Sequence, residues 1–105
     1  MTIAEARQIT KKWQEILGLS HWKIDVRWAK KSDKMDDYHG LIWWYTEEAR
    51  AEIALNRKLA DEETILHEEV HLAFEGHLPQ PKDYDRLYEQ SINRLVKVLI
   101  SVRAA

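Results

Sequence analysis

The spacing of the apolar residues changes twice along the chain, and these changes constrain its fold more than any other feature. From Ile3 to Leu17 the apolar residues recur every three or four positions, which is the period of an amphipathic helix. From Trp22 to Trp28 they alternate with polar residues, which is the period of a half-buried strand. Helical spacing returns after Asp61. A chain that places its strands between helices in this way is predicted to adopt an α+β fold.

Capping signals bound the first predicted helix. Thr2 and Glu5 have the spacing of a capping box, in which each side chain bonds the backbone of the other residue. Gly18 stands where such a helix would end. This helix is interpreted as a scaffold element that covers a sheet.

Three strands are predicted for the middle of the chain, and together they would form a small mixed sheet. The first covers residues 22–29, and the charged stretch 30–38 that follows it is predicted to be a loop. The second is Leu41–Tyr45, whose uninterrupted apolar residues predict burial on both faces. The third is Ala51–Leu55. We expect this third strand to lie at an exposed edge of the sheet, where a peptide could add as a further strand.

Two helices are predicted after the strands. Asp61 is a favourable N-cap for the first of them, with acidic residues in its first turn, and Gly76 marks its end. Pro81 marks the start of the last helix, because proline is favoured at a first helical position. The apolar stripe of this last helix consists of Tyr84, Tyr88, Ile92, Leu95, Leu99 and Val102.

Composition limits the classes of protein to consider. With 105 residues and a mass of 12.5 kDa, residues 1–105 are expected to form one domain. Sixteen basic and eighteen acidic residues give a net charge of −2, which argues against a nucleic-acid partner. No apolar run approaches the ~20 residues that a membrane span requires, and no signal-peptide core is present, so we expect a cytoplasmic protein with no membrane partner. The chain contains no cysteine, which excludes disulfides and thiolate metal sites.

One motif carries chemistry, and it is the sequence His67-Glu68-Glu69-Val70-His71 within a predicted helix. Histidines four positions apart lie one turn apart and only ~40° apart around the axis, so both imidazoles can reach one cation. Glu68 is rotated by ~100° from His67, which suits a general base better than a ligand. The alternative, a chance match of histidines and a glutamate, is disfavoured by the apolar residues on the opposite side of the same helix.

The third metal ligand has several candidates. Glu75 lies eight positions, or ~12 Å of helix rise, from His67, and is set aside as a ligand. His77 has the spacing of the third histidine in H-E-x-x-H-x-x-G-x-x-H, but Phe74 stands where that pattern requires glycine. Glu89 lies at the border of the apolar stripe of the last helix, where a carboxylate needs a partner, and Asp85 is the fallback one turn earlier. We predict that Glu89 completes a His₂Glu set.

The order of these segments resembles a known family. The segments are a Trp-x-Ile-x-Val strand, Ala-Glu-Ile-Ala-Leu-Asn, Glu-Glu-Thr-Ile-Leu-His-Glu-Glu-Val-His and a closing Tyr-Glu-Gln-Ser-Ile-Asn-Arg-Leu. Together they resemble the minimal glutamate-zincins, or minigluzincins, and related small metallopeptidases of phages and prokaryotes. The resemblance implies a zincin-like fold with a three-stranded mixed sheet, an active-site helix and a C-terminal glutamate helix.

The resemblance also implies a ligand set and an activity. His67, His71 and Glu89 would bind Zn²⁺, and Glu68 would act as general base and acid in the hydrolysis of a peptide or protein substrate. The family includes latent enzymes, so the implied endopeptidase is either active or latent. A second electrophile is expected to stabilise the transition state, and His77, Tyr84, Tyr88 and Tyr45 are its candidates.

Two other functions are compatible with the sequence. In the first, a zinc ion staples a small core and no catalysis occurs. In the second, the chain is a protein interaction domain that uses its tryptophans. Trp43 and Trp44 are adjacent, so in a strand their side chains must point to opposite faces.

Overall fold

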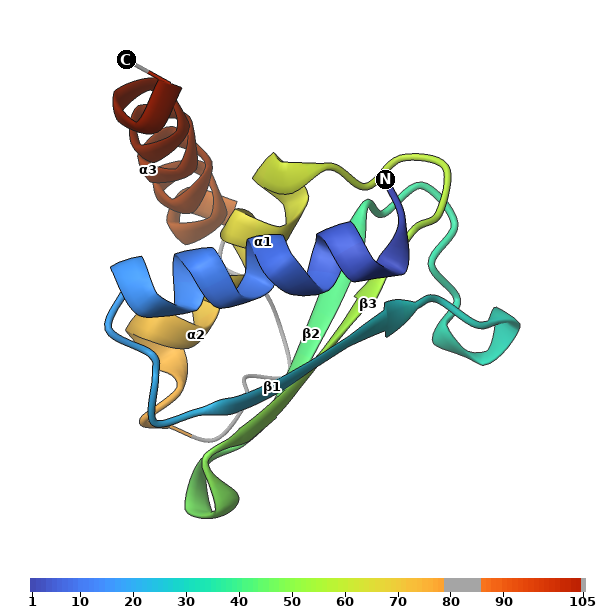
Figure 1. Ribbon diagram of the computed structural model, residues 1–105, viewed down its shortest axis with the longest axis horizontal. Coiled ribbons are helices and arrows are strands. Elements are labelled where there is room, and N and C mark those ends of the chain that lie inside the picture. Colours follow the sequence, from blue (N-terminus) through green and yellow to red (C-terminus); the bar gives the residue numbers. More distant parts are fainter. Residues whose placement is uncertain (79–85, 105) are drawn as a thin grey trace.

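The computed structural model describes residues 1–78 and 86–104, and within them it shows an α+β fold with three α-helices and a three-stranded mixed sheet (Figure 1). The elements, in chain order, are α1 (Ile3–Ile16), β1 (Lys23–Trp28), β2 (Gly40–Tyr45), β3 (Arg50–Leu55), α2 (Glu62–Glu75) and α3 (Arg86–Ala104), with short 3₁₀ turns at Lys31–Asp33 and Thr46–Glu48. The expected order of helices and strands is therefore confirmed. The expected start of the last helix at Pro81 lies outside the described residues.

β3 is the central strand of the sheet, whose order is β1-β3-β2. It pairs in parallel with β1, with Val26 opposite Ile53, and antiparallel with β2, with Ile42 opposite the same residue. The expectation that Ala51–Leu55 forms an exposed edge is therefore wrong, because both sides of this strand are already hydrogen-bonded. A strand in that position cannot accept a peptide by strand addition.

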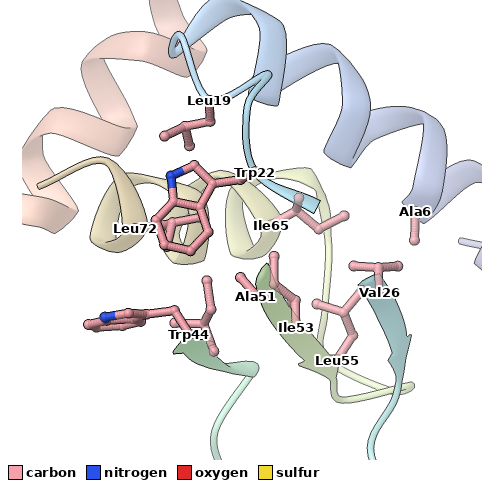
Figure 2. Packing of buried hydrophobic residues seen from close by; sticks show 11 residues of the cluster. Ala6, Leu19, Trp22, Val26, Trp44, Ala51, Ile53, Leu55, Ile65 and Leu72 are labelled. Carbon is pink, nitrogen blue, oxygen red and sulfur yellow. The ribbon is translucent and has the colours of Figure 1, made fainter. Parts of the chain in front are cut away.

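α1 and α2 cover one face of the sheet, and the larger part of the core lies between them and the strands. Figure 2 shows the two helices on the same side of the three strands, with their apolar side chains meeting between the layers. The buried members of this cluster are Ala6, Leu19, Trp22, Val26, Ile42, Trp44, Ala51, Ile53, Leu55, Ile65 and Leu72. This core fixes how α2 lies relative to β2 and β3.

Among the described residues no helix covers the opposite face of the sheet, and this corrects the expectation for β2. Ile42 and Trp44 are buried in the core, whereas Tyr45 is 45% exposed and Trp43 is half-buried on the other face. The strand is thus buried on one face only, despite its apolar sequence. Trp43 and Trp44 do point to opposite faces, as predicted, and the Arg27 guanidinium lies 5.7 Å from the centre of the Trp43 ring.

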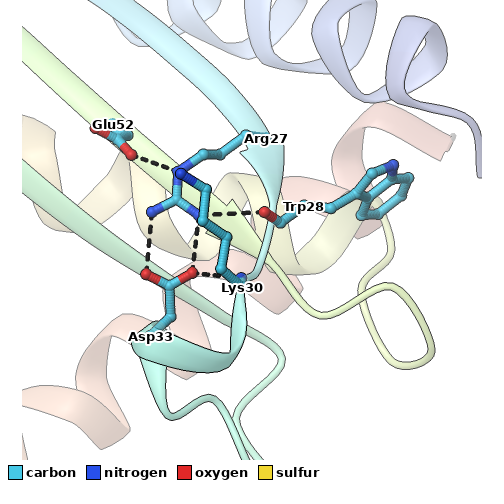
Figure 3. Close-up of polar contacts among 5 residues, drawn as sticks. All are labelled: Arg27, Trp28, Lys30, Asp33 and Glu52. Carbon is cyan, nitrogen blue, oxygen red and sulfur yellow. Dashed lines mark hydrogen bonds and ion pairs between the residues drawn. The ribbon is translucent and has the colours of Figure 1, made fainter.

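An ion-pair network on the uncovered face attaches the loop 30–39 to the sheet (Figure 3). Arg27 donates two hydrogen bonds to the carboxylate of Asp33, at 2.8 and 3.0 Å, and a third to Glu52 on β3. The backbone N–H of Lys30 also donates to Asp33, at 2.6 Å. The hydrogen bonds from Arg27 hold the pKa of Asp33 well below its usual range. Asp33 therefore remains ionised and keeps the loop in place.

A second apolar cluster joins the three helices. Leu66 and Val70 of α2 pack with Ile92 and Val96 of α3, and Trp13 of α1 completes the cluster. These side chains are at most 3% exposed. α3 is therefore held against α2 at a defined register.

None of the helices in the described parts of the chain is long and apolar enough to span a membrane.

The helix ends follow the predicted signals. Thr2 and Glu5 form the expected capping box of α1, and Gly18, with φ of +71°, follows the end of that helix. The Asp61 side chain accepts the backbone N–H of Thr64 at 3.0 Å and so caps α2. Both helices thus begin and end close to where the sequence predicts.

The buried carboxyl of Glu69 is expected to lower the stability of the fold. Its side chain is fully buried, and within the described structure neither of its carboxyl oxygens has a hydrogen-bond partner. Burial raises the pKa of Glu69 to about 9, so the carboxyl is neutral at pH 7. We expect Glu69→Met to raise the free energy of unfolding of the metal-free protein by about 1–3 kcal/mol, because an unpaired buried polar group is replaced by an apolar chain of similar shape.

Urea denaturation at pH 7 measures this change. Glu69→Gln serves as the matched control, because it keeps the shape and a polar head group, and we expect a smaller gain or none. A Glu69→Met variant less stable than the wild-type protein would show that Glu69 has a stabilising partner.

Candidate metal centre

The two histidines of the motif lie on one face of α2. Their Nε2 atoms are 3.2 Å apart, and their rings meet edge to face with centroids 4.9 Å apart. The face of α2 that carries Ile65 and Leu72 packs on the sheet, and the face that carries Leu66 and Val70 packs on α3. The remaining face, with both imidazoles, is directed toward a cleft.

Glu89 of α3 brings a carboxylate to the same point. Its Oε1 lies 2.6 Å from His67 Nε2, and its Oε2 lies 3.0 Å from His71 Nε2. Donor atoms of the three side chains all lie within 4.8 Å of one another. Ligand atoms at 2.0–2.1 Å from a tetrahedral ion are separated from one another by about 3.3 Å. The three residues could therefore hold a metal ion with little rearrangement.

One carboxylate oxygen of Glu89 shows whether the residues at this point suit a metal ion. Its Oε2 is buried and has no hydrogen-bond partner in the described part of the chain, although His71 Nε2 is close. A buried carboxylate oxygen that accepts no hydrogen bond raises the free energy of the folded state, and a bound cation would offset this cost. Two imidazole nitrogens and one carboxylate oxygen form a donor set suited to a divalent transition metal. The residues present therefore fit a metal ion.

Each imidazole also contacts a second polar side chain. The side chain of Asn93, one turn after Glu89 on α3, lies beside His67 in the lining of the cleft. Glu75 Oε2 lies 3.3 Å from Nδ1 of His71. Burial lowers the pKa of His67, and this outweighs the opposing effect of the nearby Glu89 carboxylate. A lowered pKa favours the neutral imidazole, which is the form that binds metals.

Glu68 lies beside the three ligand residues but is not one of them. Its side chain lines the same cleft and is 6% exposed. Burial, together with the negative charge of Glu89, raises the pKa of Glu68 to about 8. In the protein without a metal, Glu68 is therefore largely protonated at neutral pH. A cation held by the neighbouring residues would favour its carboxylate form.

The cleft has a volume of about 590 Å³ and lies between the start of β2, the first three turns of α2 and the start of α3. This volume is sufficient for a few residues of an extended peptide. Its lining residues are Tyr38, His39, Gly40, Leu41, Asp61, Glu63, Thr64, His67, Glu68, His71, Glu89 and Asn93.

His77 is not part of the metal group. α2 continues without reversal through Phe74 to Glu75, so His77 lies beyond its end, exposed and outside the cleft lining. The chain does not turn at Phe74 because a bulky residue there favours continued helix over a positive-φ reversal. Of the two candidates for the third ligand, Glu89 therefore lies beside the two histidines and His77 does not.

The other candidates for transition-state stabilisation lie either away from the cleft or outside the described residues. The Tyr45 ring stacks on Arg50, with 4.6 Å from the guanidinium to the ring centre, on the sheet face that the helices do not cover. Tyr84 and the fallback ligand Asp85 lie outside the described residues, as does the side chain of Tyr88.

The lining residues that the sequence analysis did not single out for the site include Tyr38, His39 and Asn93. Tyr38 is the last residue of the charged stretch that was predicted to be a loop. The spacing of four between Glu89 and Asn93 places both on one helix face, and this signal could have found Asn93. Nothing local marks Tyr38 and His39, because the sheet and the network around Arg27 bring them to the cleft.

Comparison of the chain with protein-family models, with curated proteins and with solved structures gave no match. The functional interpretation therefore depends on the geometry of this site.

Gly40 allows β2 to approach α2 closely beside Glu68. A Cβ atom at this position would lie 2.8 Å from Thr64 Cγ2 and 3.6 Å from Glu68 Cγ. The first distance is shorter than a carbon–carbon contact allows, so either the strand or the helix would have to move. Glycine therefore sets the spacing between the two walls of the cleft.

This close contact predicts an interaction between two substitutions. We expect Gly40→Ala to lower the free energy of unfolding by about 1–3 kcal/mol, because the new methyl group overlaps Thr64 Cγ2. Thr64→Ser removes that methyl group and keeps the hydroxyl that bonds Asp61. In the double variant we therefore expect most of the lost stability to return.

A double-mutant cycle measured by urea denaturation provides the test, with Thr64→Ser alone as the control. If the losses in the two single variants simply add, then the contact does not limit the approach of β2 to α2.

Proposed function

We propose that this protein is a zinc-dependent metallopeptidase with a zincin-like fold, similar to the minimal glutamate-zincins. The observation that carries the proposal is the convergence of His67, His71 and Glu89 at one point, with the buried carboxyl of Glu68 next to them. The three ligands come from two helices and leave the cleft side of the group accessible. A catalytic zinc site has this form, with three protein ligands and one open position.

Zinc is the metal that this donor set favours, because His₂Glu sets are typical of catalytic zinc in peptidases. When bound, the ion would polarise a peptide carbonyl and make an attacking water molecule more acidic. The roles of the protein's own residues follow from their positions.

Glu68 is the general base of the proposed reaction. It accepts a proton from the attacking water at its carboxylate and then donates that proton to the amine of the leaving peptide. Its burial is suited to this role, since the raised pKa brings the carboxyl closer to the pH at which both steps must occur. Glu68 is held at the side of the cleft by the helix that also carries His67 and His71, so the three groups keep a fixed geometry.

The proposed substrate is a peptide or an unfolded protein segment that enters the cleft. The cleft has a volume that can take a short extended segment, and one wall is formed by the first residues of β2. A folded protein would have to release a segment before cleavage, because His71 is only 3% exposed. The enzyme is thus proposed to be an endopeptidase.

The assignment of Glu89 predicts different effects for two substitutions. Glu89→Ala should weaken zinc binding by far more than tenfold, because it removes a charged ligand atom. His77→Ala, the matched control, should leave the dissociation constant unchanged. Competition with a chromogenic chelator measures both constants. If His77→Ala weakens zinc binding and Glu89→Ala does not, the glutamate-zincin assignment is wrong. The third ligand would then be His77, as in the pattern H-E-x-x-H-x-x-G-x-x-H.

The proposed role of Glu68 predicts that its substitution abolishes peptide cleavage without affecting zinc binding. Glu68→Gln should retain one zinc ion per chain and lose cleavage of labelled, denatured casein by at least about 100-fold, because the amide cannot accept the proton. Atomic absorption gives the zinc content, and release of label gives the rate. Equal and low activity of the zinc-loaded wild-type protein and the variant would favour the alternative, a zinc-stapled module without catalysis.

A further inference from the structure

Glu75, in the last turn of α2, contacts one of the proposed metal ligands without being a ligand itself. Its Oε2 lies 3.3 Å from Nδ1 of His71, while Nε2 of the same ring is directed at Glu89 and His67. Because Glu75 follows His71 by four residues, the two side chains lie on the same face of the helix. The eight positions between His67 and Glu75 prevent Glu75 from reaching the metal group.

The two ring nitrogens of His71 therefore have different partners. A neutral imidazole carries one hydrogen, either on Nδ1 or on Nε2, and only the nitrogen without it can bind a metal. A carboxylate can only accept hydrogen bonds, so Glu75 favours the form with hydrogen on Nδ1. His71 is 3% exposed, and water has little access to take over this role. Glu75 thus selects the tautomer whose Nε2 faces the centre.

We propose that Glu75 is a positioning residue of the metal centre, which orients the His71 ring and fixes its metal-binding tautomer. The proposal rests on the metal site of the proposed function, and it extends that site to a residue that binds neither metal nor substrate. Asn93 lies beside His67, so each imidazole has one polar side chain next to it from outside the ligand group.

The location of Glu75 in α2 supports a role beyond helix stability. A negative charge is unfavourable near the C-terminal end of a helix, where the dipole is itself negative, and α2 has no basic residue in its last turn. Glu75 therefore occupies a position where a carboxylate weakens the isolated helix. Its contact with His71 provides a reason for the carboxylate there.

The structure also holds this end of α2 in place. Thr46 donates a hydrogen bond to the carbonyl of Gly76 at 2.8 Å, and the Trp44 indole donates one to the carbonyl of Leu78 at 2.9 Å. A Cβ on Gly76 would lie 2.9 Å from the Trp22 ring, which shows how closely this turn is packed. The backbone of Glu75 is thus held beside β2, from where its side chain contacts the His71 ring.

The test compares Glu75→Ala and Glu75→Gln with the matched control Glu15→Ala, which removes an exposed carboxylate from the last turn of α1. Zinc dissociation constants are measured on the full chain by chelator competition between pH 6 and 8. We expect 10–100-fold weaker binding for Glu75→Ala, a smaller loss for Glu75→Gln, whose amide oxygen still accepts a hydrogen bond, and no change for the control.

Two further measurements separate positioning from a purely structural role. The melting temperature of metal-free Glu75→Ala should equal or exceed that of the wild-type protein, because the unfavourable charge at the helix end is gone. In ¹⁵N NMR spectra of the zinc-loaded protein, the Nδ1–H of His71 should be protected from exchange in the wild-type protein and in Glu75→Gln. It should lose that protection in Glu75→Ala.

Wild-type zinc affinity in Glu75→Ala, or a loss of affinity that follows a fall in its melting temperature, would overturn the proposal while leaving the proposed function intact. If the wild-type protein itself binds no zinc, the proposed function and the role of Glu75 both fail.

Discussion

The apolar contact between α2 and α3 is the interaction on which the candidate metal centre depends. Leu66 and Val70 meet Ile92 and Val96 on one side of α2, while the two histidines occupy the neighbouring face. Because the glutamate of α3 lies one turn before Ile92, the register of this packing decides whether its carboxylate reaches both imidazoles. A shift of α3 by one residue would move it by about 1.5 Å along the helix and by about 100° around it. The ligand set is therefore a consequence of core packing.

Local sequence patterns predicted most of the site because its parts lie on helices. The spacing of His67 and His71 fixes their common face, and the position of Glu89 at the border of an apolar stripe directs it toward the neighbouring helix. The strand order could not be predicted in the same way, since it depends on contacts between distant segments. β3 was placed at the edge, although four of its six residues are buried and Glu52 is paired with Arg27. That degree of burial is typical of a central strand, but the short sequence Ala-Glu-Ile-Ala-Leu does not reveal it.

The neighbouring residues Glu68 and Glu69 show what a sequence motif leaves undecided. Both are buried and both have raised pKa values, yet Glu68 faces the cleft and Glu69 faces the interior of the protein. A rotation of ~100° between consecutive helical residues accounts for the difference. In the proposed function, the buried carboxyl of Glu68 would have a catalytic role that compensates for the free-energy cost of its burial. The same acid in the core has no such compensation in the described structure, and it lowers the stability of a domain whose core is already small.

The cleft also depends on contacts made on the far side of the sheet. Arg27 and Asp33 hold the loop 30–39 against the face that no helix covers, and this loop leads directly into Gly40. Gly40 in turn lets β2 approach α2 to the point where an added methyl group would overlap Thr64. The cleft wall formed by the start of β2 is therefore held by two contacts. The Arg27–Asp33 ion pair acts on one face of the sheet, and the close approach of Gly40 to Thr64 acts on the other. A general base acts only over hydrogen-bond distances, so in the proposed reaction a wall fixed in this way would keep a bound peptide within reach of Glu68.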